Sequence, residues 1–122
     1  MILLDTNAVI WLDVAHPRSR PLTRATAALY VSPATLLEIQ FLMEAGRIRL
    51  TRDDAQALAS DDRWLVDDPP AAAWFAEAID LTWTRDPFDR LIAAHAQLRG
   101  WRLATGDTRL QRALGARRTL EL

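Results

Sequence analysis

Short apolar runs alternate along this chain with longer stretches of helical periodicity. Ile2-Leu3-Leu4 is a short apolar run that ends at Asp5, and Tyr30-Val31 and the segment from Trp101 to Ala104 have a similar character. Between these runs, apolar residues recur every three or four positions, as on one face of a helix. Strands that alternate with helices predict an α/β fold in which a parallel sheet is covered on both faces.

Capping residues mark the ends of two predicted helices. Ser32-Pro33 begins a helix that we expect to run through Glu44, with Gly46 as its C-terminal stop. Asp86-Pro87 begins another, which ends near Arg99 before a glycine. The other expected elements are a helix from Asp5, a loop over 16–21, helices over 23–29, 69–79 and 108–114, a helix capped by Thr51 with Asp54 as its partner, and strands over 64–66 and 118–122.

Composition indicates a globular protein, because half of the 122 residues are hydrophobic and a quarter are charged. We expect a single domain over residues 1–122. No apolar run reaches the ~18–20 residues of a membrane span, and the start lacks the basic segment of a signal peptide. The chain has no cysteine, which fits a reducing compartment. We therefore expect a cytoplasmic protein with no membrane partner.

The basic residues exclude several functions. All 15 are arginine, so the chain has no lysine for a phosphate-binding loop, a Schiff base or a phosphotransfer receiver. The net charge of −1 does not imply a general attraction to nucleic acid, but arginines can still gather on one face. Two groups either hold RNA backbone or form a solvated surface: Arg18, Arg20 and Arg24, and Arg109, Arg112, Arg117 and Arg118.

Four acids follow strands or begin helices. Asp5 and Asp107 come directly after predicted strands, at the edge where parallel sheets bind ligands, although each could simply cap the next helix. Asp86 and Asp89 lie one helical turn apart, which suits an N-cap and its third helical position. Asp89 nevertheless points away from the apolar stripe of its helix, on a face with small neighbours.

Glu38 interrupts the apolar helix that follows Ser32. Helical spacing places it on or beside the packed face, where an unpaired charge costs several kcal/mol on the order of magnitude. Its carboxylate therefore pairs with an arginine, faces water at the rim, or belongs to a functional site.

The acids gain meaning if they converge. Carboxylates about 4 Å apart repel each other by about 4 kcal/mol at an effective dielectric near 20, so such a cluster requires bound protons or a cation. Oxygen ligands alone suit Mg²⁺ or Mn²⁺. A water on such an ion can become the nucleophile that attacks a phosphodiester.

The sequence resembles the PIN-domain family, specifically the toxin ribonucleases of the VapC type. Four blocks carry the resemblance, in the order and spacing of that family: Ile2-Leu3-Leu4-Asp5-Thr6-Asn7, Ser32 to Ile39, Arg85 to Ala96, and Leu103-Ala104-Thr105-Gly106-Asp107. The resemblance implies a three-layer PIN-like fold, with a central parallel sheet flanked by helices, and a metal-dependent endoribonuclease that acts as the toxin of a toxin–antitoxin pair. The alternative is a PIN-like module that has lost catalysis and binds proteins.

The resemblance also implies roles for individual residues. Asp5, Asp89 and Asp107 would be the ligands of Mg²⁺ or Mn²⁺, and Glu38 would complete the shell or orient the attacking water. Thr6, Asn7 and Thr105 would support them by hydrogen bonds, and Asp86 would be either a cap or a ligand. The expected partners are an RNA substrate, a cognate antitoxin and a second copy of the chain.

Overall fold

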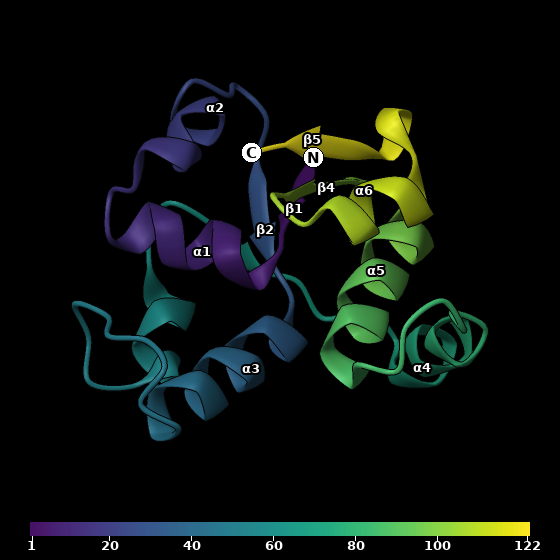
Figure 1. Ribbon diagram of the computed structural model, residues 1–122, viewed down its shortest axis with the longest axis horizontal. Helices are drawn as coiled ribbons and strands as arrows, with labels where there is room; N and C mark the ends of the chain where they lie inside the picture. The colour runs from purple at the N-terminus through teal and green to yellow at the C-terminus, as the bar shows by residue number, and fades with distance from the viewer.

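The computed structural model describes residues 1–122, which form a five-stranded parallel sheet covered by helices (Figure 1). The strands are β1 (Ile2–Leu4), β2 (Leu29–Val31), β3 (Leu65–Val66), β4 (Arg102–Thr105) and β5 (Thr119–Glu121). Their order is β3-β2-β1-β4-β5, so β1 is central, and Leu3 pairs with Tyr30 on one side and Leu103 on the other. From β1 the chain adds β2 and β3 on one side and then β4 and β5 on the other. Such a reversal of strand order creates a crevice at the carboxyl ends of β1 and β4.

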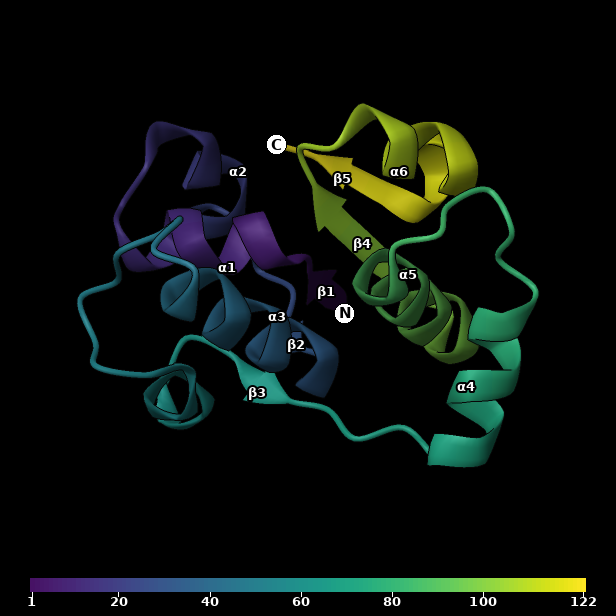
Figure 2. The same ribbon diagram turned by 60° about the horizontal axis from the view of Figure 1, so that its bottom comes forward.

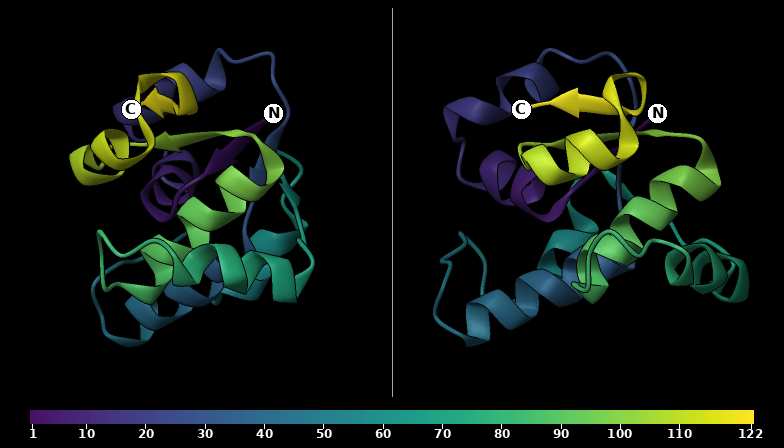
Figure 3. Two further views of the ribbon diagram at one scale, coloured as in Figure 1. Left: turned by 90° about the vertical axis from the view of Figure 1, so that its right-hand side faces the viewer. Right: turned by 45° about the vertical axis from the view of Figure 1, so that its right-hand side comes forward.

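Helices form a layer on each face of the sheet (Figure 2). α1 (Thr6–Asp13) and α2 (Arg20–Thr23) lie on one side, and α4 (Ala71–Ile79), α5 (Pro87–Arg99) and α6 (Thr108–Leu114) lie on the other. α3 (Pro33–Glu44) contacts both α1 and α5, and Figure 3 shows α3 and α5 side by side. Three short 3₁₀ helices complete the chain: η1 (Pro17–Ser19), η2 (Ala55–Ser60) and η3 (Ala116–Arg118). No helix is both long and apolar enough to cross a bilayer.

The alternation of side chains along β1 divides the core in two. Ile2 and Leu4 belong to a cluster with α1, and Leu3 belongs to a cluster with α5 on the opposite face. Both neighbours of β1 repeat this pattern, with Val31 on the first face and Leu103 on the second. The predicted three-layer α/β arrangement is therefore confirmed, and its central strand ends at Asp5 between the two layers.

The capped helices lie where the sequence predicts them. Ser32 Oγ accepts a hydrogen bond from the Ala34 N–H at 3.2 Å, so α3 begins at Pro33 and ends at Glu44. Gly100 ends α5 in the left-handed conformation, with φ of 69°. A glycine adopts this conformation without the steric penalty of a Cβ atom.

The expected loop over 16–21 is wrong, because η1 and α2 lie there, and the expected helix over 23–29 is wrong as well. α2 ends at Thr23, whose hydroxyl donates to the carbonyl oxygen of Arg20, and Leu29 already belongs to β2. The Ile2 N–H donates to the Ala28 carbonyl oxygen at 3.0 Å, at the point where β2 joins β1. Pairing with the central strand thus outweighs the helical preference of this alanine-rich segment.

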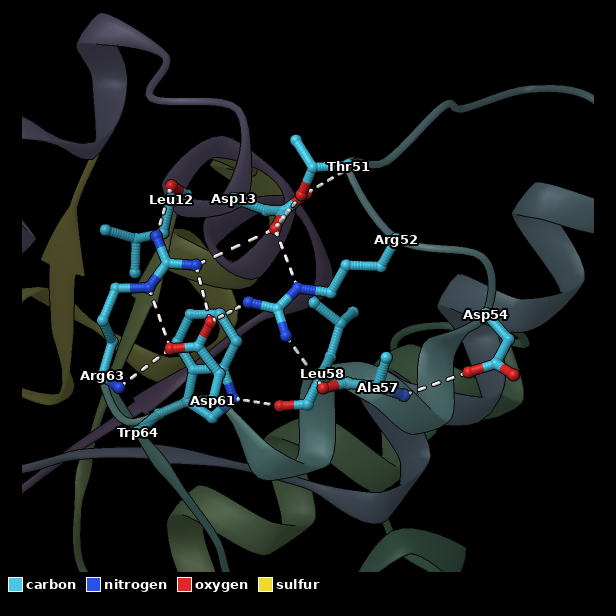
Figure 4. A network of polar contacts seen from close by, with 10 residues as sticks. All are labelled: Leu12, Asp13, Thr51, Arg52, Asp54, Ala57, Leu58, Asp61, Arg63 and Trp64. Atoms are coloured by element: carbon cyan, nitrogen blue, oxygen red, sulfur yellow. Dashed lines mark hydrogen bonds and ion pairs between the residues drawn. The ribbon is translucent and has the colours of Figure 1, made fainter.

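The expected cap at Thr51 is also wrong. Thr51 Oγ1 donates to the carboxylate of Asp13 at the end of α1, with 3.0 Å to Oδ1 (Figure 4). Asp54 is itself the N-cap, accepting from the Ala57 N–H at 3.0 Å, and the element that follows is η2 rather than an α-helix. The long-range bond to Asp13 takes the hydroxyl that the capping box would have needed.

Two arginines and two buried aspartates fasten the segment between α3 and β3 to α1 (Figure 4). Arg52 and Arg63 both form ion pairs with Asp13 and Asp61, whose side chains are only 1% and 6% exposed. Hydrogen bonds from the Arg63 side chain lower the pKa of Asp61 to about 2. This network explains how a stretch with little regular structure keeps a fixed position.

His95 lies in the core, as its place on the apolar stripe of α5 predicts. It is fully buried, and its Nε2 lies 2.7 Å from Asp67 Oδ2, just beyond β3. Burial lowers the pKa of His95, which favours the neutral ring. Trp64 and Trp74 are buried as well, whereas Trp83 is 38% exposed.

Candidate active site

The acids predicted from four separate segments surround one cavity at the carboxyl ends of β1 and β4. The cavity has a volume of about 220 Å³. Its polar lining consists of Asp5, Thr6, Asn7, Glu38, Asp89 and Asp107. Leu42, Ile92 and Leu110 form its apolar walls. The structure therefore brings the predicted acidic residues together, although each comes from a different element.

Asp5 follows β1 and is both a helix cap and a wall of the cavity. Its Oδ1 accepts a hydrogen bond from the Ala8 N–H at 2.8 Å, which fixes the start of α1. The residue is only 5% exposed, and burial raises the pKa of its carboxyl to about 6. The nearby charges of Asp107 and Asp89 add to that increase, while hydrogen bonds from Thr105 and Ala8 oppose it.

Glu38 extends from α3 into the same cavity, and its partner is a hydroxyl group. Thr6 Oγ1 donates a hydrogen bond to Glu38 Oε1, and no arginine forms an ion pair with this carboxylate. Burial raises the pKa of Glu38, with further contributions from the charges of Asp86 and Asp5. The possibility of an arginine pair is thus wrong, and the half-buried carboxylate faces the other acids.

Asp86 and Asp89 have different tasks at the start of α5. Asp86 is exposed and caps the helix, because its Oδ1 accepts from the N–H groups of Phe88 at 2.8 Å and Asp89 at 3.1 Å. The backbone N–H of Asp86 donates to Thr84 Oγ1, so Asp89 does not complete a capping box. Instead the Asp89 side chain lines the cavity, where burial and the charge of Asp86 raise its pKa to about 6.

Asp107 follows β4 and is the acid of the cavity that lies nearest to Arg109. Its Oδ1 accepts from the Arg109 N–H at 2.8 Å, and Arg109 Nη2 lies 3.1 Å from its Oδ2. Burial acts to raise the pKa of Asp107, but these hydrogen bonds from Arg109 outweigh it and lower the pKa. The buried Thr105 accepts the backbone N–H of Asp107 at 3.0 Å and so holds the turn between β4 and α6.

A contact that sequence reasoning missed supports this turn from behind. Arg18 donates through Nη2 to the Leu122 carbonyl oxygen at 2.9 Å, and its guanidinium lies 4.3 Å from the centre of the Trp11 ring. Both side chains pack against Gly106, where an added Cβ atom would lie 2.5 Å from Arg18 Nη2 and 2.7 Å from Trp11 Cη2. The sequence gives no signal for this contact, because Arg18, which lies in η1, is 88 residues away from Gly106.

The charge balance of the cavity favours a bound cation. Asp5, Glu38 and Asp89 all have raised pKa values, and the only arginine that forms an ion pair with the acids of the cavity is Arg109. No three acidic or histidine side chains are already arranged as ligands of one ion. The donors are nevertheless all oxygens, which is the set that hard divalent ions such as Mg²⁺ and Mn²⁺ prefer.

Comparisons with known proteins identify the family of this chain. The family model of the PIN domain matches residues 2–115. Ribonuclease VapC22 of Mycobacterium tuberculosis (strain ATCC 25618 / H37Rv) is 34% identical over 118 residues, which cover 90% of this chain and 89% of that protein.

Solved structures share the fold at lower identity. A toxin-antitoxin complex from Klebsiella pneumoniae contains a chain that is 18% identical with a TM-score of 0.70, and the match covers 100% of both chains. FitAcB from Neisseria gonorrhoeae is 23% identical with a TM-score of 0.55, over 93% of this chain and 92% of that one. From the family match and the relative with 34% identity, we conclude that this chain belongs to the PIN-domain family.

Proposed function

We propose that this chain is a metal-dependent endoribonuclease that cleaves RNA phosphodiester bonds and acts as the toxin of a toxin–antitoxin pair. The observation that carries this proposal is the meeting of Asp5, Glu38, Asp89 and Asp107 around one cavity. The relative with 34% identity is a ribonuclease, which supports the choice of RNA as substrate. The structural relative from a toxin-antitoxin complex supports the choice of an antitoxin as partner.

The oxygen donors of the cavity suit Mg²⁺ or Mn²⁺, with Asp5, Asp89 and Asp107 as the residues that would hold the ion. When bound, such an ion supplies an activated water and neutralises charge that develops on the phosphate. Glu38 would accept a proton from an attacking water, a role that its position in the cavity and its raised pKa support. Thr6 orients that carboxylate by its hydrogen bond, and Asn7 offers an amide at the mouth of the cavity.

The remaining polar residues hold the acids in place. Thr105 fixes the backbone that carries Asp107, and Asp86 fixes the first turn of α5 that carries Asp89. We therefore assign Asp86 as a cap whose charge tunes Asp89 and Glu38. We also propose that the chain forms a homodimer, since Leu37 and Phe41 on α3 and Phe75 and Ile79 on α4 are all more than half exposed.

The direct test is Asp5→Asn, with RNA cleavage measured in the presence of Mn²⁺ and the fold checked by a thermal melt. Asparagine remains a good N-cap for α1, so we expect cleavage to be lost while the protein stays folded. Asp53→Asn is the matched control, because Asp53 is exposed and makes no side-chain contact with the cavity. Full cleavage by the Asp5 variant would reject the proposal. A wild-type protein that binds no Mn²⁺ and cleaves no RNA would instead be a protein-binding module.

A further inference from the structure

A second hollow lies at the opposite edge of the sheet from the acidic cavity. It has a volume of about 170 Å³ and lies where α5 ends, β4 begins and η3 leads into β5. Its polar lining consists of the guanidinium groups of Arg102, Arg117 and Arg118 and the amide of Gln97, beside the indole of Trp101. No carboxylate lines it, so its charge is opposite to that of the acidic cavity.

The three arginines of this hollow are not neutralised by the protein. Arg102 Nη2 donates only to a backbone oxygen, that of Thr119 at 2.9 Å, and neither Arg117 nor Arg118 forms an ion pair. By contrast, Arg52 and Arg63 form ion pairs with Asp61, and Arg99 forms one with Asp67. Positive charge is therefore concentrated here on a chain whose net charge is −1. A concave surface of one sign concentrates ligands of the opposite sign.

The chemistry of the lining suits a phosphate group. Guanidinium groups match the paired oxygens of phosphate and remain charged at any physiological pH. Trp101 is held rigidly because it stacks on Tyr30 with 4.4 Å between the ring centres. We propose that this hollow binds a phosphate of the RNA backbone away from the site of cleavage, an inference that rests on the proposed ribonuclease function.

The distance between the two sites sets a length requirement for the RNA. Arg102 begins β4 and Asp107 follows its end, so about five residues of extended strand, or about 16 Å, separate them. A stacked nucleic-acid strand rises about 3.4 Å per nucleotide. An RNA that remains stacked must therefore extend at least about five nucleotides beyond the cleavage site to reach Arg102, Arg117 and Arg118.

The test compares the double variant Arg117→Ala/Arg118→Ala with the double variant Arg20→Ala/Arg24→Ala. Both remove two exposed arginines that form no ion pair, and the second pair lies at α2 on the other side of the sheet. Fluorescence anisotropy measures the binding of a fluorescein-labelled 20-nucleotide oligoadenylate, with EDTA present so that no RNA is cut. Each phosphate contact adds about 0.7 to the slope of log K against log salt.

We expect Arg117→Ala/Arg118→Ala to weaken binding of the 20-mer roughly tenfold at 0.1 M salt and to reduce the salt slope by about 1.4. Arg20 and Arg24 line neither the basic hollow nor the acidic cavity, so we assign them to the solvated surface and expect Arg20→Ala/Arg24→Ala to stay within about twofold of the wild type. Unchanged binding of the 20-mer by the Arg117/Arg118 variant would overturn the inference. Equal weakening by both double variants would also overturn it, because net charge would then explain the result.

The same variants separate RNA from an acidic protein partner as the occupant. If the Arg117/Arg118 variant keeps the RNA affinity of the wild type but loses affinity for the antitoxin, the hollow is a protein site and the inference fails. Failure of the ribonuclease proposal would give a different result, namely a wild-type protein that leaves the 20-mer intact in Mn²⁺. The binding measurement in EDTA is independent of that result.

Discussion

Arg109 on α6 reaches Asp89 on α5, with its Nη2 3.4 Å from Asp89 Oδ2. The same nitrogen lies 3.1 Å from Asp107 Oδ2, so one guanidinium connects two of the acids that we assign to the metal. The Arg109 side chain is 65% exposed, and a divalent ion between these carboxylates has to compete with it.

We therefore expect Arg109→Gln to bind Mn²⁺ about five- to tenfold more tightly than the wild type, because the substitution removes a competing positive charge. Isothermal titration calorimetry at pH 7.5 measures the affinity. Arg112→Gln is the matched control, since Arg112 lies one turn further along α6, is exposed and forms no ion pair. Equal Mn²⁺ affinity in wild type and Arg109→Gln would contradict this account of the guanidinium.

The second prediction concerns the stability cost of Asp5. Burial raises the pKa of Asp5 from 3.8 to about 6, so the folded chain binds this proton more tightly than the unfolded chain does. Stability therefore falls as the pH rises from about 4 to about 6. In EDTA at pH 7.5 we expect Asp5→Asn to be more stable than the wild type by up to about 3 kcal/mol, a difference that disappears near pH 4. Urea denaturation at both pH values measures it, and a less stable variant at pH 7.5 would refute it.

The third prediction concerns Gly106. A Cβ atom there would lie 2.5 Å from Arg18 Nη2 and 2.7 Å from Trp11 Cη2, so Gly106→Ala has to displace these side chains or the turn that carries Asp107. We expect a loss of about 1–3 kcal/mol in the free energy of unfolding, together with reduced cleavage. Trp11→Leu removes the ring edge, so Gly106→Ala should reduce stability and cleavage less in the Trp11→Leu background than in the wild type. Strictly additive effects would exclude this steric origin.

The fourth prediction concerns the ion-pair network of Figure 4. Hydrogen bonds and charges of Arg63 and Arg52 lower the pKa of Asp61 to about 2. The stability that Asp61 contributes is therefore present above about pH 4 and is lost as the pH falls toward 2. Asp61→Asn should destabilise the protein on the order of 2 kcal/mol at pH 7 and progressively less below pH 4, measured by urea denaturation. Asp62→Asn, at the exposed next position, should have no such effect.

Local signals predicted the elements that carry the site. Ser32-Pro33 and Asp86-Pro87 cap α3 and α5 where the sequence indicates, and the apolar run before Asp5 forms the central strand. Because parallel strands end at one edge of the sheet, the positions of Asp5 and Asp107 in the fold followed from their order in the sequence. Both residues cap a helix and also line the cavity, because each cap uses only one of the two carboxylate oxygens.

Contacts between distant segments account for what the sequence could not predict. Thr51 bonds Asp13 instead of capping a helix, and the segment over 23–29 gives up its helix to pair with β1. The partner of Glu38 is the hydroxyl of Thr6, which is 32 residues away, and no local pattern distinguishes that bond from an arginine pair. Arg109 belongs to the acidic cavity rather than only to the basic surface, because α6 folds back beside α5.

The central place of β1 has a consequence during protein synthesis. Leu3 is synthesised a hundred residues before Leu103, which is one of its two neighbours in the sheet. Pairing over such a separation is slow to form, and β1 can pair with β4 only after β4 has been synthesised. The acidic cavity around Asp5 therefore cannot form until the segment around Asp107 has emerged. For the ribonuclease that we propose, RNA cleavage therefore requires that synthesis has proceeded at least as far as Asp107.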